Sequence, residues 1–461
     1  MRSSLLVAAG LALTAFSVAP NAPGASAATP VCAACVRATM EKLAGDELRG
    51  RKCGSADENA AARYLADALA SLGVKGAAAG GGYLQQVHLI DQTYASEPTL
   101  ELTSGSANLR LTNGREMVAQ GAPPLLEAPI VRITDPQAPL DGLRGALVIY
   151  EPDFTNVAAS QVLRAGAAAV ILRANSAVLQ HWEELAARPP SRAQVVDGVQ
   201  RPTATSSGVL IFVSDETLAS LASFGGGQAR LSATRGEPQA RTTYNVIGVR
   251  HGQAKDADQH AVLLTSHYDH LGVRDGVIFH GANDDASGTA AVMEFARILA
   301  RGRTPQRTVY FAMFGCEEEG ALGAQYFLTH LPSPVTDIAA NLEFEMIGVD
   351  DPVQPGALML TGWERSNLGP ALAAHGARIG PDHYPEQHFF QRSDNYQLAL
   401  QGVVAQTVTA WPLPPTYHAA TDDLGHVDLN FMDQVIGSLV GPVTWLLNSD
   451  FQPEWNPGMK P

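Results

Sequence analysis

The chain has 461 residues, of which 46% are hydrophobic and 17% are charged, and its formal net charge is −15. This hydrophobic content is enough for a sizeable core and argues against wholesale disorder, and the length suggests two or three domains. The acidic balance argues against nucleic acid or an anionic membrane surface as the main partner.

The N-terminal segment has the features of a signal peptide. Arg2 supplies a positive charge, the apolar run at 5–18 is too short to span a bilayer comfortably, and the small residues at 25–28 suit a cleavage site. We expect residues 1–28 to be removed and the mature chain to be exported to the periplasm or the extracellular space. A membrane anchor is the alternative, and no other stretch predicts a stable membrane span.

Export would permit disulfide bonds. Cys32, Cys35 and Cys53 lie close together near the mature N-terminus, whereas Cys316 stands alone at the end of an apolar stretch. We expect one bridge from Cys53 to either Cys32 or Cys35, and Cys316 as a buried free thiol. A redox or zinc role for the Cys-x-x-Cys pair is less favoured because no second pair accompanies it.

Residues 29–95 are predicted to form the first part of the main domain, with helical structure over 36–75. Ser55 and Glu58 match a capping box, apolar residues then recur at helical spacing, and Gly73 closes the helix.

Residues 96–240 are predicted to form a separate, smaller α/β or β-rich domain inserted into the main one. Three short apolar strands are expected at 145–150, 167–173 and 208–214, and few residues there suit catalysis. The glycines at 225–227 and the polar run 235–243 are interpreted as the exit linker.

Residues 241–450 alternate between strand and helix patterns, which predicts an α/β domain with a mainly parallel or mixed central sheet flanked by helices. The expected strands are Asn245–Val249, Ala261–Ser266, Thr308–Gly315, Ile338–Met346 and Gly402–Thr409. The expected helices are Ser287–Arg301, Ala321–His330, Asn367–Ile379 and Asp433–Leu447. Residues 451–461 are expected to be a loose tail.

Histidines and carboxylates gather where these strands end. The strand at 261–266 leads into His267, the strand at 308–315 into Glu317 and Glu318, and the strand at 402–409 through a Pro-rich loop to His418. Because ligands bind beyond the carboxyl ends of strands in open α/β sheets, these groups are expected to converge there. Imidazole and carboxylate without thiolate suit catalytic zinc, and manganese or cobalt would also fit.

A pair of ions needs a shared carboxylate, and Asp284 is the natural bridge. It lies on a polar turn between Gly281 and Gly288, and we expect the peptide bond between Asp284 and Asp285 to be cis.

Five motifs, in this order, resemble the secreted di-zinc aminopeptidases, a family that also includes glutamate carboxypeptidase-type enzymes and glutaminyl cyclases. They are HYDHLG at 267–272, GANDDASG at 281–288, EEEGALG at 317–323, EFEMIG at 343–348 and YHAATD at 417–422. The resemblance extends to LRGRKCGS at 48–55 and YNVIGV at 244–249, and the inserted segment is similar to a protease-associated domain. It implies the zinc-exopeptidase, phosphorylase/hydrolase-like fold.

Carried over by position, the resemblance assigns roles to nine residues. It implies that two zinc ions are held by His267, Asp284, Glu318, Glu345 and His418, with Asp284 shared. Glu317 would be the general base, Tyr417 would donate a hydrogen bond to the developing oxyanion, and Asp269 would orient His267. Asp394 would be supporting structure near the site.

The carboxylate before Met-Ile-Gly departs from the family pattern, where it is commonly Asp. Alignment on Met-Ile-Gly selects Glu345, whereas alignment on the preceding Asn selects Glu343, and we favour Glu345.

Other polar residues near these motifs have simpler interpretations. His270 and His280 are expected to make hydrogen bonds near the site or on the surface rather than to bind metal. Glu319 is expected to be solvated, and Asp285 to cap the helix that comes after it.

The leading functional hypothesis is hydrolysis of the N-terminal peptide bond of peptides or proteins. The alternatives are a carboxypeptidase or dipeptidase of the same family, for which Arg392 is a candidate carboxylate partner, a glutaminyl cyclotransferase, which uses one zinc, and a non-catalytic binding ectodomain. Side-chain specificity and oligomeric state are not predicted.

Overall fold

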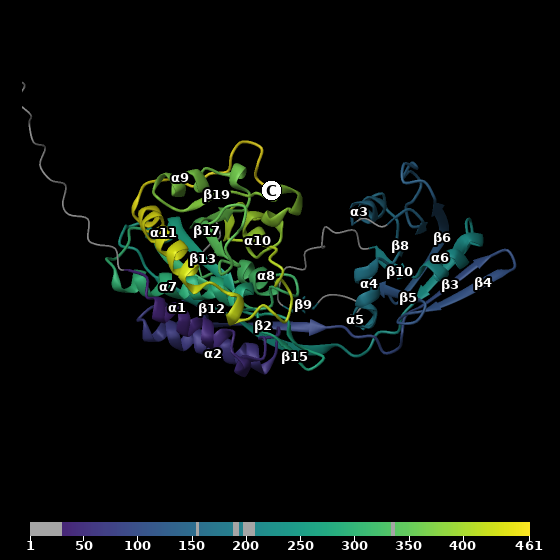
Figure 1. The fold of residues 1–461 in the computed structure, drawn as a ribbon, viewed down its shortest axis with the longest axis horizontal. Coiled ribbons are helices and arrows are strands. Elements are labelled where there is room, and N and C mark those ends of the chain that lie inside the picture. The colour runs from purple at the N-terminus through teal and green to yellow at the C-terminus, as the bar shows by residue number, and fades with distance from the viewer. Residues whose placement is uncertain (1–29, 154–155, 188–192, 197–207, 333–336) are drawn as a thin grey trace, which may run out of the picture.

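The computed structural model describes residues 30–153, 156–187, 193–196, 208–332 and 337–461, and its elements are built around two separate sheets (Figure 1). The predicted signal peptide, residues 1–28, lies outside the described residues. Within them, no helix combines the length and the apolar character that crossing a bilayer requires.

The first sheet has ten strands among the described residues, in the order β19-β18-β20-β17-β13-β16-β12-β2-β9, with β1 paired to β12. Its centre is parallel and consists of β20 (Val404–Thr409), β17 (Ile338–Phe344), β13 (Ala261–His267) and β16 (Val309–Phe314). β12 (Gln239–Arg250) runs antiparallel to β16, and β2 (Leu84–Asp91) runs antiparallel to β12. The mixed sheet predicted from the sequence is confirmed.

Short strands complete both edges of this sheet. They are β18 (Leu358–Leu360) and β19 (Ile379–Pro381) at one edge, β9 (Gln194–Val195) at the other, and β1 (Lys75–Gly76) beside β12. A separate hairpin is formed by β14 (Gly272–Arg274) and β15 (Val277–Phe279).

Helices cover both faces of the first sheet. One core contains residues of α1 (Ala33–Leu43), α2 (Ala56–Ser71), α7 (Gly288–Arg301), α9 (Leu368–Ala374) and α11 (Leu429–Asn448). The other contains residues of α8 (Leu322–Thr329) and α10 (Asn395–Ala399). Alternate residues of β13 serve the two cores, Val262 and Leu264 on one side and Ala261 and Leu263 on the other. The strand is therefore apolar on both faces.

Several helix boundaries differ from the prediction for local reasons. The region predicted to be helical over 36–75 is broken between α1 and α2 by a turn with Arg49, Gly50 and Arg51 at positive φ. Ser55 caps α2 as expected, since its hydroxyl accepts from the Glu58 N–H. α9 stops before Gly376, which has φ +99°, and α11 begins early because Asp428 caps it.

The second sheet lies within the segment predicted as an inserted domain. Its order is β4-β3-β11-β6-β7-β8-β10-β5. The parallel strands are β6 (Leu125–Ile133), β7 (Leu147–Tyr150), β8 (Ala169–Arg173) and β10 (Val209–Val213). The antiparallel ones are β3 (Thr99–Ser104), β4 (Ala107–Thr112), β5 (Met117–Gln120) and β11 (Gln228–Ser232).

Short helices flank the second sheet, and the sheet has apolar cores of its own. These helices are α3 (Asn156–Arg164), α4 (Ser176–Gln180), α5 (Trp182–Ala186) and α6 (Asp215–Ser220). The sequence predicted β7, β8 and β10, which are almost wholly buried apolar runs, but not β3 to β6 or β11, most of which mix buried with exposed or half-buried residues.

The second sheet is connected to the first through β2 and β12. Asp91 at the end of β2 faces Gln239 at the start of β12 across the antiparallel ladder. The exit linker predicted at 235–243 is therefore wrong from residue 239 onward, because those polar residues are strand partners of β2.

The cysteine prediction is wrong in both parts. Cys32 pairs with Cys35, and Cys53 pairs with Cys316, which is not a free thiol. The C-terminal tail is also less loose than expected. Trp455 forms an isolated β-bridge with Ser366, packs against both cores of the first sheet and donates its indole N–H to the Gly402 carbonyl.

Candidate metal centre and active site

The predicted ligands come from five separate places in the chain and meet beyond the carboxyl ends of the parallel strands of the first sheet. His267 ends β13, Glu318 lies just after β16, and Glu345 comes directly after β17. His418 lies in the loop after β20, and Asp284 lies in the turn before α7. The parallel order of these strands explains the convergence, since their carboxyl ends share one edge.

One group of ligand atoms consists of His267, Asp284 and Glu345, which lie within 4.8 Å of one another. His267 is fully buried, and its Nε2 atom lies 3.2 Å from Asp284 Oδ1. Its Nδ1 atom lies 3.5 Å from Asp269 Oδ1. Neither ring nitrogen has a hydrogen bond of good geometry, so the imidazole is buried but unsatisfied by protein groups alone.

The second group consists of His270, Asp284 and Glu318, again within 4.8 Å. His418 joins it, with Nε2 3.1 Å from Glu318 Oε2 and 3.2 Å from Asp284 Oδ2. His270 Nδ1 lies 2.8 Å from Glu318 Oε1 and the residue is 1% exposed.

His270 is the functional candidate that sequence interpretation misses. The sequence places it outside the ligand set because it matches no ligand position of the resembling family. The available signal is the second histidine three residues after His267, in the turn that comes directly after a buried strand.

Asp284 belongs to both groups, as a bridging ligand would. The peptide bond between Asp284 and Asp285 is cis, as predicted. The backbone N–H groups of Asn283 and Asp284 donate to the Asp422 carboxylate, at 2.8 and 3.0 Å. Asp285 accepts from the Gly288 N–H at the start of α7, which is the capping role expected for it.

A buried arginine stabilises the same turn through hydrogen bonds to backbone carbonyls. Arg51 is 0% exposed and donates to the carbonyls of His280, Gly281, Tyr268 and Leu43. Burial lowers its pKa to about 10, although the carboxylates around it, led by Asp269, oppose that shift. The guanidinium therefore stays charged at neutral pH and offsets part of the negative charge of the site.

The structure brings Glu345, rather than Glu343, to His267 and Asp284. Glu343 is fully buried and neither of its oxygens has a hydrogen-bond partner. Burial, then the neighbouring Glu345 charge, raises its pKa well above the usual range. Asp394 is equally buried and unpartnered, and burial followed by Glu343 raises its pKa in the same way.

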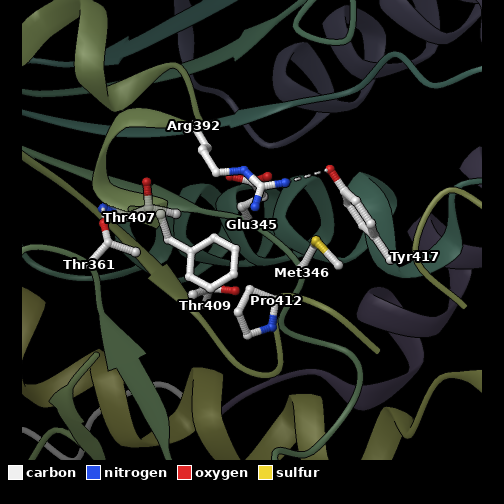
Figure 2. Close-up of a pocket in the computed structure, with 9 residues that line it drawn as sticks. Glu345, Met346, Thr361, Arg392, Thr407, Thr409, Pro412 and Tyr417 are labelled. Atoms are coloured by element: carbon white, nitrogen blue, oxygen red, sulfur yellow. Dashed lines mark hydrogen bonds between the residues drawn. The ribbon is translucent and has the colours of Figure 1, made fainter. Parts of the chain in front are cut away.

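Tyr417 lies beside His418 and borders a pocket that also contains Glu345 (Figure 2). The two rings stack with centroids 4.0 Å apart. Arg392 donates to the Tyr417 hydroxyl oxygen at 3.4 Å, which leaves the phenol proton free for another acceptor. Burial, then the Asp284 charge, raises the pKa of Tyr417, so the phenol remains a donor at neutral pH.

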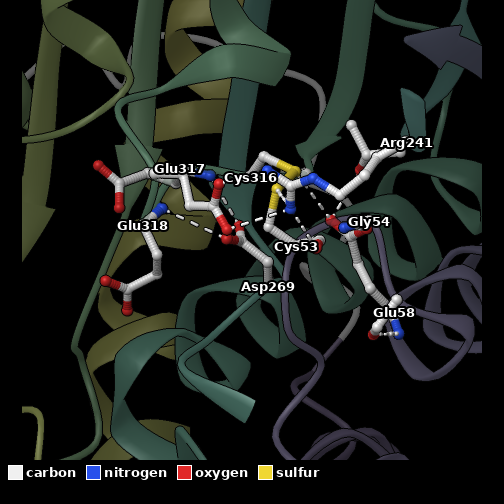
Figure 3. The surroundings of a disulfide bond; sticks show 12 residues. Cys53, Gly54, Glu58, Arg241, Asp269, Cys316, Glu317 and Glu318 are labelled. Atoms are coloured by element: carbon white, nitrogen blue, oxygen red, sulfur yellow. Dashed lines mark hydrogen bonds and ion pairs between the residues drawn. A yellow bond between two sulfur atoms is a disulfide. The ribbon is translucent and has the colours of Figure 1, made fainter. Parts of the chain in front are cut away.

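Asp269 organises the segment that carries Glu317. Its carboxylate accepts from the backbone N–H groups of Glu317 at 2.8 Å and Glu318 at 3.3 Å (Figure 3). Glu317 Oε2 lies 4.0 Å from His267 Nε2. Burial is the main cause that raises the pKa of Glu317 well above its usual range, and the negative charge of Asp394 adds to it. A carboxylate with a raised pKa is suited to accept a proton.

The Cys53–Cys316 disulfide lies directly behind this segment, since Cys316 precedes Glu317 (Figure 3). Next to it, Arg241 pairs with Glu319 at 2.6 Å and with Asp91. Glu319, expected to be solvated, is therefore held in an ion pair. Glu58 lies on the other side and accepts from the Gly54 N–H and the Thr243 hydroxyl.

These residues fit a pair of divalent ions. The donors are imidazole nitrogens and carboxylate oxygens, with no thiolate, and one carboxylate is common to both groups. The unsatisfied ring nitrogens of buried His267 and His270 are what a metal site would leave in the protein alone.

Comparisons with known proteins agree with this geometry. Residues 245–440 match the model of peptidase family M28. A probable zinc metalloprotease of Leptosphaeria maculans is 37% identical over 108 residues, 23% of this chain and 24% of that protein. Aminopeptidase YwaD of Bacillus subtilis is 30% identical over 129 residues, 28% of this chain and 24% of that protein. The matched segments thus span about a quarter of these relatives.

Solved structures share the fold over most of the chain. An aminopeptidase from Aneurinibacillus sp. strain AM-1 aligns with a TM-score of 0.59 and 20% identity, covering 94% of this chain and 96% of that one. A zinc aminopeptidase from Bacillus subtilis aligns with a TM-score of 0.53 and 19% identity, covering 91% and 96%. The segment that matches the family M28 model, residues 245–440, is also the segment that supplies every predicted metal ligand.

Proposed function

We propose that the chain is a metal-dependent aminopeptidase that removes N-terminal residues from peptides. The observation that carries the proposal is Asp284, shared between two groups of buried ligands with Glu317 beside them. The family match and the names of the matched relatives, which include zinc metalloproteases and aminopeptidases, support the same activity.

His267 and Glu345 would hold one ion, Glu318 and His418 the other, and Asp284 both. Zinc suits these donors best, and manganese or cobalt also fits. When bound, the ions supply Lewis acidity toward the scissile carbonyl and toward water, together with a site for the free α-amine.

The remaining residues manage protons and charge. Glu317 takes a proton from the attacking water as its oxygen bonds to the carbonyl carbon, and gives that proton to the leaving amine as the C–N bond breaks. Tyr417 donates its phenol proton in a hydrogen bond to the oxyanion that develops between these two steps. Asp269 positions the His267 ring and the backbone of Glu317.

We further propose that the chain is exported and that its second sheet is a protease-associated-like module that limits access to chain ends. The two disulfides support export, because such bonds persist in oxidising compartments. The separate cores of the second sheet support its role as an independent module.

The test uses aminoacyl anilides with free and with acetylated N-termini, before and after chelation. We expect turnover of the free forms only, lost on metal removal and restored by zinc, with about two zinc ions per chain in the active protein. Activity that survives complete removal of metal would refute the proposal. Preferred cleavage of N-blocked dipeptides would favour the carboxypeptidase alternative, and one ion per chain with cyclisation of N-terminal glutamine would favour the cyclotransferase.

A further inference from the structure

A pocket opens beside the predicted metal ligand Glu345, and it is lined by threonines, an arginine and a few apolar side chains (Figure 2). We propose that this pocket binds the side chain of the substrate's first residue and that its residues select an acidic side chain, aspartate or glutamate. This proposal rests on the aminopeptidase function proposed above and names its substrate class.

The position of the pocket identifies the group that would enter it. In an N-terminal residue, one carbon carries the α-amine, the scissile carbonyl and the side chain. If the amine and carbonyl lie at the metal ligands, the side chain must leave from the same spot within a few bond lengths. The pocket shares Glu345 with the ligand set and Tyr417 with the His418 loop, so it begins at that spot.

The threonines of the pocket offer hydroxyls with unused hydrogen-bonding capacity. Thr407 and Thr409 are 2% and 3% exposed, and neither Oγ1 atom has a hydrogen-bond partner among the described residues. Thr361, 1% exposed, accepts from the Thr407 N–H and keeps its hydroxyl proton available. Buried hydroxyls without partners are costly, so they favour a polar group that enters and pairs with them.

Arg392 gives this pocket a positively charged group. The rings of Phe389 and Tyr417 hold its guanidinium, at 5.0 and 6.0 Å from the ring centroids. Among the described residues, no carboxylate lies within 4.0 Å of it, and its hydrogen bond to the Tyr417 hydroxyl uses only one of its five donors. An oriented guanidinium without a counterion, next to free hydroxyls, matches a carboxylate.

The apolar lining fits the rest of an acidic side chain. Met346, Phe389 and Pro412 complete the pocket wall and can contact methylene groups between the backbone and the carboxylate. A leucine side chain would leave the threonine hydroxyls and the guanidinium without partners, and a lysine side chain would face Arg392 with like charge. Both are therefore expected to bind less well.

The experiment compares glutamyl, glutaminyl and leucyl anilides in wild-type holoenzyme and three variants. Arg392→Gln removes the charge, and Thr407→Val removes one hydroxyl while keeping the shape. Arg365→Gln is the matched control, because Arg365 also lies over an aromatic ring, Phe390, but does not line the pocket. Thermal midpoints check that each variant is folded.

We expect wild-type kcat/KM to be highest for the glutamyl substrate. Arg392→Gln should lower it by about 10- to 100-fold for the glutamyl anilide and by less than about threefold for the glutaminyl one. Thr407→Val should reduce both polar substrates by about tenfold relative to the leucyl anilide. Arg365→Gln should change none of them.

Binding to the inactive variant Glu317→Gln gives a readout that does not depend on turnover. Calorimetry with that variant should show tighter binding of glutamate than of glutamine, and the difference should vanish when Arg392→Gln is added. Equal losses for all three substrates would instead show that Arg392 acts only through Tyr417 and would overturn the acidic preference. A leucyl preference would overturn it as well, while turnover of no substrate by zinc-loaded enzyme would refute the aminopeptidase function itself.

Discussion

The two sheets bury similar apolar strands but differ in the residues at which those strands end. β13 leads into His267, which is fully buried, whereas β8 ends at Arg173, which reaches Asp153 and Asp215 at the surface. Over the described part of residues 99–232, Asn113 is the one polar side chain in the buried class, while the edge of the first sheet buries many carboxylates and histidines.

This difference suggests that the first sheet carries the functional site and that the second sheet has a structural role. Burying ionisable groups costs free energy unless they are paired or bind metal, so a concentration of unpaired ones at one place points to function. The second sheet shows that the same chain builds stable parallel strands without them. Substitutions in both sheets test whether the polar edge of the first sheet is indeed functional, from the largest expected effect to the smallest.

Glu317→Gln tests the proposed general base, which lies with the predicted metal ligands at the carboxyl ends of the parallel strands of the first sheet. The amide cannot accept the proton from water, so kcat should fall by about 10²- to 10⁴-fold. Because Glu317 is not among the ligands, metal content measured by atomic emission should stay at the wild-type value. Wild-type turnover in this variant would show that another group is the base.

Arg51→Met removes the buried cation behind the metal turn. Four carbonyls would lose their donor and the acidic edge its nearest buried positive charge, so unfolding free energy should fall by about 3–5 kcal/mol, measured by denaturant titration. Zinc affinity should fall with it.

Ile171→Ala in β8 is the matched control for Arg51→Met, because it also acts at a fully buried residue. It should destabilise the second sheet by about 2–5 kcal/mol through a cavity, yet leave kcat/KM unchanged at temperatures where the protein is folded. A loss of zinc affinity in this control would break the distinction between the two sheets.

His270→Ala tests whether the second group of ligands depends on the histidine that motif alignment omits. Without the imidazole, Glu318 loses the partner at 2.8 Å, and zinc affinity should fall by about 10- to 100-fold in competition with a chelator of known affinity. His280→Ala is the comparison, since His280 pairs with Asp46 near the surface and should not affect zinc. Equal affinities in the two variants would place His270 outside the metal centre.

Glu58→Gln should have the smallest effect and a characteristic pH dependence. Burial is the largest cause that raises the pKa of Glu58 well above its usual range, so the folded protein keeps a proton that the unfolded chain releases above about pH 4.3. Wild-type stability should therefore decline as pH rises from that value toward the folded pKa, by up to about 1–2 kcal/mol more than in the variant. Parallel stability profiles of the two proteins from pH 4 to 8 would argue against this.

Sequence reasoning recovers features that are local or strictly periodic. β13 and β16 begin as apolar runs, are buried at every position and lead into titratable residues, and Ser55 caps α2 through a contact three residues away. The convergence of His267 and Glu318 near the Asp284 turn was predictable because ligands bind beyond the carboxyl ends of parallel strands.

The missed features depend on partners distant in the chain. Cys316 looks free in the sequence because its partner, Cys53, is 263 residues away and only the fold brings them together. β2 and the first half of β12 are polar on one face, and their pairing with each other defines them as strands. His270 is missed because it matches no ligand position of the resembling family, and only the fold shows that it is buried beside Glu318.

The ladder pair at Asp91 and Gln239 has a consequence for the history of the chain. The chain leaves the first sheet after Asp91 and rejoins it at Gln239, one strand spacing away, about 4.8 Å, and on the way it adds β9 beside β2 at the edge of the same sheet. The second sheet is thus an insertion in the connection between two paired antiparallel strands, β2 and β12. A different module could therefore replace the second sheet at this point of the chain while the residues at the carboxyl ends of the parallel strands stay as they are.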